Sequence, residues 1–158
     1  MGNENDGILL FDRHAGMVVP YRTAQNVGTA IYNVFSMLVD DQTLWIAAFQ
    51  RGIEAVDLKS RTVKSYLADP SDPSSRVFVL FRSSSGRIWA GTSVGLFYYD
   101  RFEDRFVTRD PKVRISDITE DHAGRLWIAT NEDGLYSYDA RTDLLQHYRY
   151  DPDDPATI

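Results

Sequence analysis

The chain has 158 residues, 43% of them hydrophobic and 13% aromatic, and this composition indicates a packed globular protein rather than a disordered segment. A formal net charge of −6 argues against nucleic-acid binding, because phosphate recognition needs clustered lysine and arginine. The lack of cysteine excludes disulfides, thiolate zinc sites and cysteine nucleophiles, and no apolar stretch approaches the ~18 residues of a membrane-spanning helix.

Four segments along the chain share one pattern, which begins with glycine and an aliphatic residue and ends with aspartate. Their glycines lie 45, 43 and 39 residues apart, and three of the segments follow a second shared block that contains tryptophan. Such a dense match at a steady period predicts an internal repeat of one structural unit. The glycine segments are Gly7–Asp12, Gly52–Asp57, Gly95–Asp100 and Gly134–Asp139, and the tryptophan blocks are Leu44–Ala47, Ile88–Gly91 and Leu126–Ala129.

The repeated unit is predicted to be a sheet of four antiparallel strands. Its apolar runs are short, rich in aromatic and β-branched residues and bounded by turn residues, and no segment has a sustained helical stripe. The second strand of the unit is apolar on both faces, so other sheets must cover it on both sides. Such a sheet, repeated at about 40–45 residues, is a β-propeller blade. In the last repeat, strands are expected over residues 115–120, 125–130, 135–139 and 145–150.

Taken in order, the repeats predict half a blade over residues 1–29, whole blades over 30–75 and 76–112, and a blade with a linker over 113–158. The fold class is therefore all-β, with about three and a half blades, whereas closed propellers usually have about 4 to 8. An incomplete propeller exposes blade faces and strand edges. The chain is expected to be part of a larger propeller, or to satisfy its open ends by self-association.

Two of the repeats resemble the two-component regulator propeller repeat. The resemblance rests on Gly124–Thr130 with Gly134–Asp139, and on Gly86–Thr92 with Gly95–Asp100. The copy at Asp40–Ile46 departs from the pattern, since it lacks the turn glycine and is two residues shorter.

This resemblance implies a propeller on the periplasmic side of a bacterial inner membrane, in a parent protein that is anchored there and continues into a cytoplasmic histidine kinase. It also implies that the parent senses carbohydrate breakdown products, so an oligosaccharide is the expected ligand. No kinase or DNA-binding part is present in these residues. The segment itself is therefore expected not to be an enzyme.

The repeated tryptophans and aspartates are expected to be structural. Trp45, Trp89 and Trp127 keep the register of the repeat and have apolar neighbours, so they are predicted to pack between blades rather than to stack on sugars. The aspartates that end the glycine segments, such as Asp139, precede turn-forming residues. They are predicted to cap those turns through hydrogen bonds from the backbone.

No metal, cofactor or catalytic group is predicted. The loops 69–75 and 151–156 concentrate aspartate and proline, but neither has the alternating spacing of a calcium loop, so both are interpreted as rigid connections. His14, His122 and His147 are isolated in the sequence, and no pair has the spacing of a zinc motif.

The loops between the second and third strands of each repeat differ from one another, although their flanks agree. Functional variation in repeat proteins belongs at such positions on one rim. Gln50, Arg51, Asn131 and Glu132 are therefore the predicted ligand-binding residues, since their side chains suit sugar hydroxyls. Arg51 also suits the carboxylate of an acidic sugar.

Three functions remain open at this point. The leading hypothesis is a ligand-sensing segment of a membrane-bound two-component regulator. The second is a fragment of a propeller glycosidase or lyase, although no nonrepeating set of carboxylate, tyrosine and histidine is visible in the sequence. The third is a protein-interaction platform like the WD-repeat propellers, whose Gly-His and Trp-Asp pairs are absent here.

Overall fold

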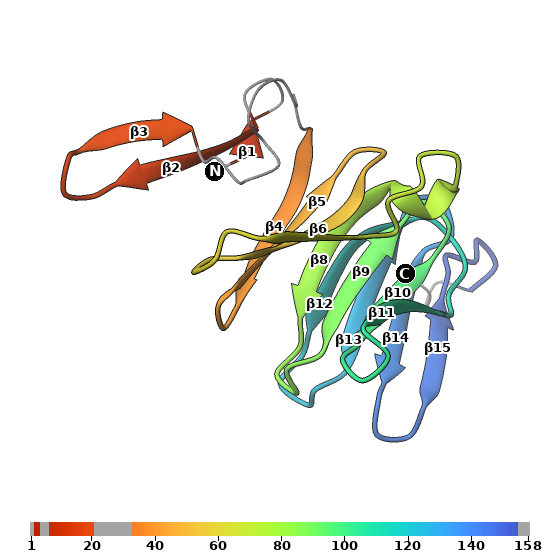
Figure 1. The fold of residues 1–158 in the computed structure, drawn as a ribbon. Helices are drawn as coiled ribbons and strands as arrows, with labels where there is room; N and C mark the ends of the chain where they lie inside the picture. Colours follow the sequence, from red (N-terminus) through yellow and green to blue (C-terminus); the bar gives the residue numbers. More distant parts are fainter. Residues whose placement is uncertain (1, 4–6, 21–32, 155–158) are drawn as a thin grey trace. The chain divides into compact units, whose positions relative to one another are not determined.

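The computed structural model describes residues 2–3, 7–20 and 33–154, which form four antiparallel sheets and one short 3₁₀-helix (Figure 1). Each of the three sheets after residue 33 contains four strands that are hydrogen-bonded in sequence order. This is the arrangement of propeller blades, so the predicted all-β class and incomplete propeller are confirmed. The described residues contain no α-helix.

The chain divides into two compact units, Met1–Val77 and Phe78–Ile158. In the first unit, β1, β2 and β3 form a three-stranded sheet, and β4 to β7 form a four-stranded sheet. The half blade predicted over residues 1–29 contains β1, β2 and β3, while its residues 1, 4–6 and 21–29 lie outside the described residues. The strands are β1 (Gly2–Asn3), β2 (Gly7–Asp12), β3 (Met17–Pro20), β4 (Val34–Asp40), β5 (Thr43–Ala48), β6 (Gly52–Asp57) and β7 (Val63–Tyr66).

The acidic loop 69–75, which includes the 3₁₀-helix η1 (Pro73–Ser75), uses its carboxylates on its own backbone. Asp69 Oδ1 accepts hydrogen bonds from the backbone N–H and the hydroxyl of Ser71, at 2.9 and 2.7 Å. These hydrogen bonds, the one from the hydroxyl first, lower the pKa of Asp69. Asp72 caps η1 by accepting from the N–H of Ser74 at 2.8 Å. The carboxylates of Asp69 and Asp72 thus bond to groups of their own loop.

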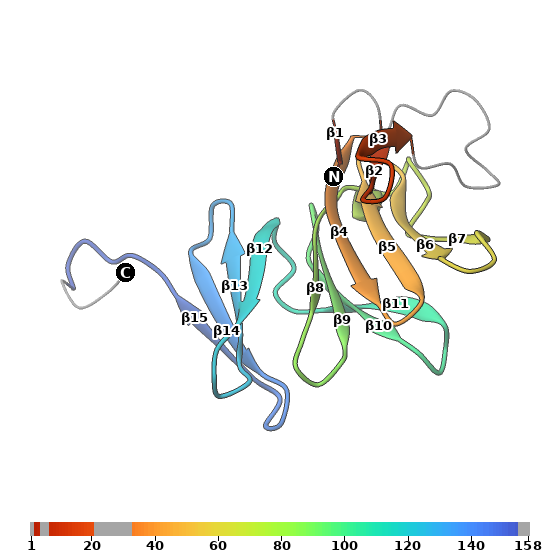
Figure 2. The same cartoon turned by 90° about the vertical axis from the view of Figure 1, so that its left-hand side faces the viewer.

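The second unit contains two blades, which appear as separate layers in Figure 2. In the last repeat, the predicted strands 115–120 and 135–139 match β12 and β14. The second strand begins at residue 126 rather than 125, and the fourth spans 144–148 rather than 145–150. The fourth strand ends at Tyr148 because its partner Leu135 is the first residue of β14. The strands are β8 (Val77–Arg82), β9 (Ile88–Thr92), β10 (Leu96–Asp100), β11 (Arg105–Arg109), β12 (Ile115–Glu120), β13 (Leu126–Thr130), β14 (Leu135–Asp139) and β15 (Leu144–Tyr148).

The core of the second unit lies between its two blades. Buried side chains of β9 and β10 pack against those of β12, β13 and β14. The sheets approach closely at Gly91, where an added Cβ would lie 2.6 Å from side-chain carbons of Ile115 and Val79. The other repeats carry Ala47 and Ala129 at this position, so glycine here is a local adaptation to close packing. The buried set is Trp89, Leu96, Ile115, Ile118, Leu126, Ile128, Tyr136 and Tyr138.

The three tryptophans differ in what they contact. Trp89 packs against Tyr138 of the neighbouring blade, with ring centroids 5.7 Å apart, which confirms its predicted place between blades. Trp45 is buried and lies against Tyr66 in the outer strand of its own sheet. Trp127 is half-buried and lies in the same way against Tyr148.

The aspartates that end the glycine segments cap turns as predicted. Asp57 Oδ1 accepts from the N–H groups of Lys59 and Ser60, at 3.0 and 2.6 Å. Asp100 and Asp139 accept in the same way from the residues two positions later, each at 2.9 Å. These carboxylates therefore stabilise the turns between the third and fourth strands.

Candidate functional site

The loop between β13 and β14 borders a hollow of about 290 Å³ in the second unit. Asn131, Glu132 and Asp133 line it from this loop, and Val113 and Arg114 line it from the segment that leads into β12. We call it the rim hollow. The two segments are joined by a backbone hydrogen bond of 3.1 Å from the N–H of Asn131 to the carbonyl of Arg114. Two predicted ligand-binding residues, Asn131 and Glu132, are thus brought together with three that were not predicted.

The shape of this loop follows from Thr130 and Gly134. The Thr130 hydroxyl donates to the Gly134 carbonyl at 2.7 Å and accepts from the N–H of Asp133 at 3.0 Å, which closes a tight turn. Gly134 has a φ of +75°, and a Cβ there would lie 2.4 Å from the carbonyl oxygen of Tyr148. Only glycine fits this position, so the loop presents its side chains from a defined backbone.

Asp133, which lines the rim hollow, is held by several neighbouring residues. Its Oδ2 accepts a 2.5 Å hydrogen bond from the hydroxyl of Tyr136, and Arg149 Nη1 lies 3.8 Å from its Oδ1. His147 Nε2 donates to the backbone carbonyl of Asp133 at 2.6 Å. The His147 ring also stacks on Tyr136, with centroids 4.1 Å apart and planes 1° from parallel.

Tyr136 is a neutral hydrogen-bond donor in this cluster. Burial, followed by the hydrogen bond to Asp133 and its negative charge, raises the pKa of Tyr136 to about 12. The phenol therefore stays protonated at neutral pH and holds the Asp133 carboxylate in place. The arrangement suits positioning of a loop rather than nucleophilic attack by tyrosinate.

Sequence reasoning missed His147 as a neighbour of Asp133, because the two are 14 positions apart. A signal was nevertheless present. The turn between β14 and β15 places Asp139 opposite Leu144, and the alternation of the hairpin then places Tyr136 opposite His147. His147 is thus isolated along the chain but not in space. Among residues 2–3, 7–20 and 33–154, no group of three or more histidine, aspartate and glutamate side chains is arranged to hold a metal ion.

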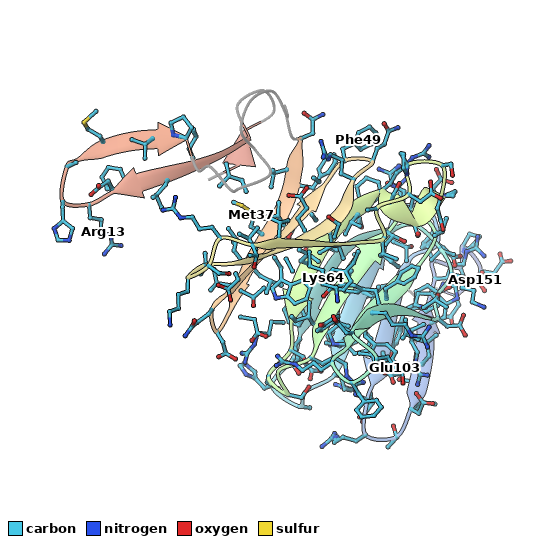
Figure 3. All side chains as sticks on the ribbon, viewed as in Figure 1. Arg13, Met37, Phe49, Lys64, Glu103 and Asp151 are labelled. Carbon is cyan, nitrogen blue, oxygen red and sulfur yellow. The ribbon has the colours of Figure 1, made fainter. Side chains whose placement is uncertain are left out.

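Gln50 and Arg51, the other two predicted ligand-binding residues, lie in the corresponding loop of the first unit. They follow Phe49, which is labelled in Figure 3, and both are exposed. Gln50 has a φ of +57°, so this loop also makes a tight left-handed turn. The positive charge of Arg51 lowers the pKa of the nearby buried Glu54, but the larger effect of burial raises that pKa overall. Arg51 therefore already interacts with an acid of its own sheet.

The arginine that lines the rim hollow is held by an aromatic ring. The guanidinium of Arg114 lies over Phe78, 4.6 Å from the ring centroid, which favours a cation–π contact. Arg114 remains exposed, so its N–H groups are accessible from the hollow.

No helix in the described part is both long and apolar enough to cross a membrane.

Residues 110–132 match the family described as two component regulator propeller, which confirms the resemblance inferred from the repeat. Among curated proteins, the chain is 34% identical over 97 residues to histidine kinase P4 of Formosa agariphila. That alignment covers 51% of this chain and 7% of the relative, so the chain spans a small part of the kinase's length.

The solved structures most informative about the fold are extracellular domains of two hybrid two component systems of B. thetaiotaomicron. The first is 22% identical with a TM-score of 0.79, and the match covers 94% of this chain and 19% of that domain. The second is 18% identical with a TM-score of 0.77, covering 99% and 21%. Virginiamycin B lyase of Staphylococcus aureus is also similar, at 17% identity and a TM-score of 0.58, over 74% of this chain and 41% of the lyase. At these identities the likeness concerns the fold alone.

Proposed function

We propose that this chain is a segment of the sensor propeller of a two-component regulator, and that its rim hollow binds an oligosaccharide released by carbohydrate breakdown. The parent protein would be anchored in the inner membrane, with this segment in the periplasm. One observation carries the proposal. The match to the two component regulator propeller spans residues 110–132, and four of the five residues that line the rim hollow lie within it.

The chemistry of the rim hollow suits a polar, hydroxylated ligand. The Asn131 amide both donates and accepts, Glu132 accepts, and Arg114 donates, which matches sugar hydroxyls that do both. Asn131 Nδ2 and Glu132 Oε1 are 3.5 Å apart, so only a long hydrogen bond between them competes with a ligand. A volume of about 290 Å³ is near the lower end of small-molecule pockets and suits the terminal part of an oligosaccharide.

Gln50 and Arg51 are proposed as sugar contacts of the first unit, on the same chemical grounds. Their loop occupies the same position in its blade as Asn131–Asp133 does in the last one. Their contribution is separable from that of the rim hollow, because the two pairs belong to different compact units.

The proposal is tested by titrating the 158-residue chain with neutral and acidic oligosaccharides in a calorimeter. The variant Asn131→Ala/Glu132→Ala is expected to weaken binding roughly tenfold or more, since two polar contacts are lost. Glu103→Ala is the matched control for charge, because Glu103, labelled in Figure 3, lies in the exposed turn between β10 and β11. This control is expected to bind like the parent chain.

Three results would contradict the proposal. The first is that no oligosaccharide binds, and the second is that the double variant binds as well as the parent chain. The third is cleavage of the added oligosaccharide, detected by chromatography of the products, which would favour the glycosidase or lyase hypothesis instead.

A further inference from the structure

The two blades of the second unit have equivalent turns between their first and second strands. Ser83–Arg87 joins β8 to β9, and Asp121–Arg125 joins β12 to β13. In both turns the first residue donates its N–H to the carbonyl of the arginine, at 3.0 and 2.9 Å. In both, the glycine N–H donates to the carbonyl of the first residue, at 2.8 and 2.9 Å. The turns therefore have the same backbone and differ in the side chain at their first position.

In the last blade, the carboxylate of Asp121 gathers four donors. Its Oδ1 accepts from the backbone N–H groups of Ala123 and Arg125, at 2.9 and 3.0 Å. Its Oδ2 accepts from Nε of Arg125 and from the indole Nε1 of Trp127, at 2.9 and 3.0 Å. These hydrogen bonds lower the pKa of Asp121 to about 2, with that from the Arg125 backbone as the largest cause. The donor set of this turn thus holds a carboxylate.

In the preceding blade, serine stands in the place of this aspartate, and its single hydroxyl oxygen cannot replace both oxygens of a carboxylate. The Ser83 hydroxyl accepts from the N–H of Arg87 at 3.2 Å, in the place of Asp121 Oδ1. Nothing takes the place of Oδ2. Trp89 is only 1% exposed, so its indole Nε1 is buried, and this nitrogen has no hydrogen-bond partner. An unpartnered buried donor is unfavourable, so this position calls for an acceptor.

The arginine of this turn is also without a carboxylate. The guanidinium of Arg87 lies 5.8 Å from the Trp89 ring centroid, as that of Arg125 lies 5.6 Å from Trp127. It also lies 5.0 Å from the Tyr98 ring centroid. Arg125 forms an ion pair with Asp121, whereas no ion pair of Arg87 is found among the described residues. Arg87 is exposed and can therefore reach a ligand from solvent.

A cavity of about 260 Å³, which we call the turn cavity, has both Arg87 and Trp89 among its lining residues. Ser83, Arg87 and Trp89 line it from one blade. Glu120 and Arg141 line it from the next, and both are already engaged. Glu120 accepts from the N–H and hydroxyl of Ser84, at 2.6 and 2.9 Å, and Arg141 pairs with Asp139 at 3.3 Å.

We propose that the turn cavity binds the carboxylate group of a small acidic ligand, which the Trp89 indole N–H and the Arg87 guanidinium hold as Trp127 and Arg125 hold Asp121. The ligand carboxylate supplies the oxygen that Ser83 lacks. This site does not depend on the proposed oligosaccharide site. The turn cavity borders the turn that precedes β13, whereas the rim hollow borders the loop that follows it.

The indole N–H signals of the three tryptophans in a ¹⁵N-labelled chain report on this site directly. Sodium acetate and sodium glucuronate are titrated at constant pH and ionic strength, with glucose as the neutral comparison. The Trp89 signal is expected to move with an acid and the Trp127 signal to stay in place. Movement with both acids assigns a bare carboxylate, and movement with glucuronate alone assigns a uronic acid. No movement with either acid, or equal movement with glucose, overturns the proposal.

Ser83→Asp supplies the missing carboxylate from within the chain. This variant is expected to shift the Trp89 indole signal without ligand and to weaken binding of the acid roughly tenfold or more. Gln146→Glu adds the same charge on the exposed face of β15 and is expected to bind like the parent chain. Arg87→Gln, at an exposed position, provides a second test if Ser83→Asp does not fold. Acid binding unchanged in Arg87→Gln overturns the proposal.

Discussion

Trp89 in β9 packs edge-on against Tyr138 in β14, with ring centroids 5.7 Å apart and ring planes inclined by 70°. Both side chains are buried. The Tyr138 hydroxyl accepts from Arg109 in β11 at 3.0 Å and donates to Asp143 at 2.8 Å, and Arg109 and Asp143 also form an ion pair. This contact therefore joins the two blades of the second unit from their core to their surface.

Replacing Trp89 with alanine is expected to lower the free energy of unfolding by about 3–5 kcal/mol, because it leaves a cavity between the blades. Urea unfolding followed by circular dichroism measures the change. Phe102→Ala is the control, since Phe102 is 93% exposed and its loss is expected to change stability by no more than about 0.5 kcal/mol. Equal losses in both variants would show that the contact between Trp89 and Tyr138 does not hold the blades together.

Gly91→Ala is expected to destabilise the chain by about 1–3 kcal/mol, because the new methyl group overpacks the space between β9 and β12. The added Cβ would lie 2.6 Å from Cγ2 of Ile115 and from Cγ1 of Val79. Thermal unfolding measures the effect. In a double-mutant cycle with Val79→Ala, which removes the contacting Cγ1 of one neighbour, Gly91→Ala is expected to cost less stability than it does in the parent chain. A Gly91→Ala chain as stable as the parent would contradict this close approach.

Stability is expected to fall as the pH drops from about 4 to about 2, partly through Asp121. Its folded-state pKa is about 2, below its usual 3.8, so its hydrogen bonds stabilise the chain above the usual pKa and are lost as the pH falls through the folded value. In Asp121→Asn this acid-dependent loss should be smaller. Glu103→Gln controls for the removal of one negative charge. Identical pH profiles of Asp121→Asn and the parent chain would argue against this role of Asp121.

Self-association is expected from the sheet of β1, β2 and β3, which leaves apolar side chains exposed. Phe11 on β2 is 59% exposed, and Met17 and Val18 on the paired strand β3 are exposed as well. We propose that a second copy of the chain covers this surface. Sedimentation velocity over a range of concentrations tests it, with Phe11→Ser/Val18→Ser expected to shift the chain towards monomer and Phe102→Ser expected not to. A monomer at every concentration would contradict the expectation.

The repeat was predictable because its determinants are local. A glycine, an aliphatic residue and a closing aspartate mark the start and end of each third strand, and β6, β10 and β14 lie within those limits. The capping role of Asp57, Asp100 and Asp139 was predictable for the same reason, since each carboxylate bonds the backbone two residues later.

The candidate site was predictable only in part. Asn131 and Glu132 were found by their position in a variable loop, and the structure places them together on the rim hollow. Their partners were not found, because Arg114 and His147 reach the loop through strand pairing rather than through sequence proximity. Whether these residues, or Gln50 and Arg51, bind a sugar stays a prediction.

Period, strand order and turn caps follow from residues that are close in sequence, so they can be derived from the chain as written. The environment of each tryptophan cannot be derived in this way, although all three occupy the same place in the repeat. The indole N–H of Trp127 donates to Asp121. Trp89 instead lies buried against Tyr138, and its indole N–H has no acceptor. The hydrogen-bond difference follows from serine at position 83, where the last repeat has Asp121. The burial of Trp89 depends instead on which sheet packs against which, and such contacts exist only once the blades have assembled.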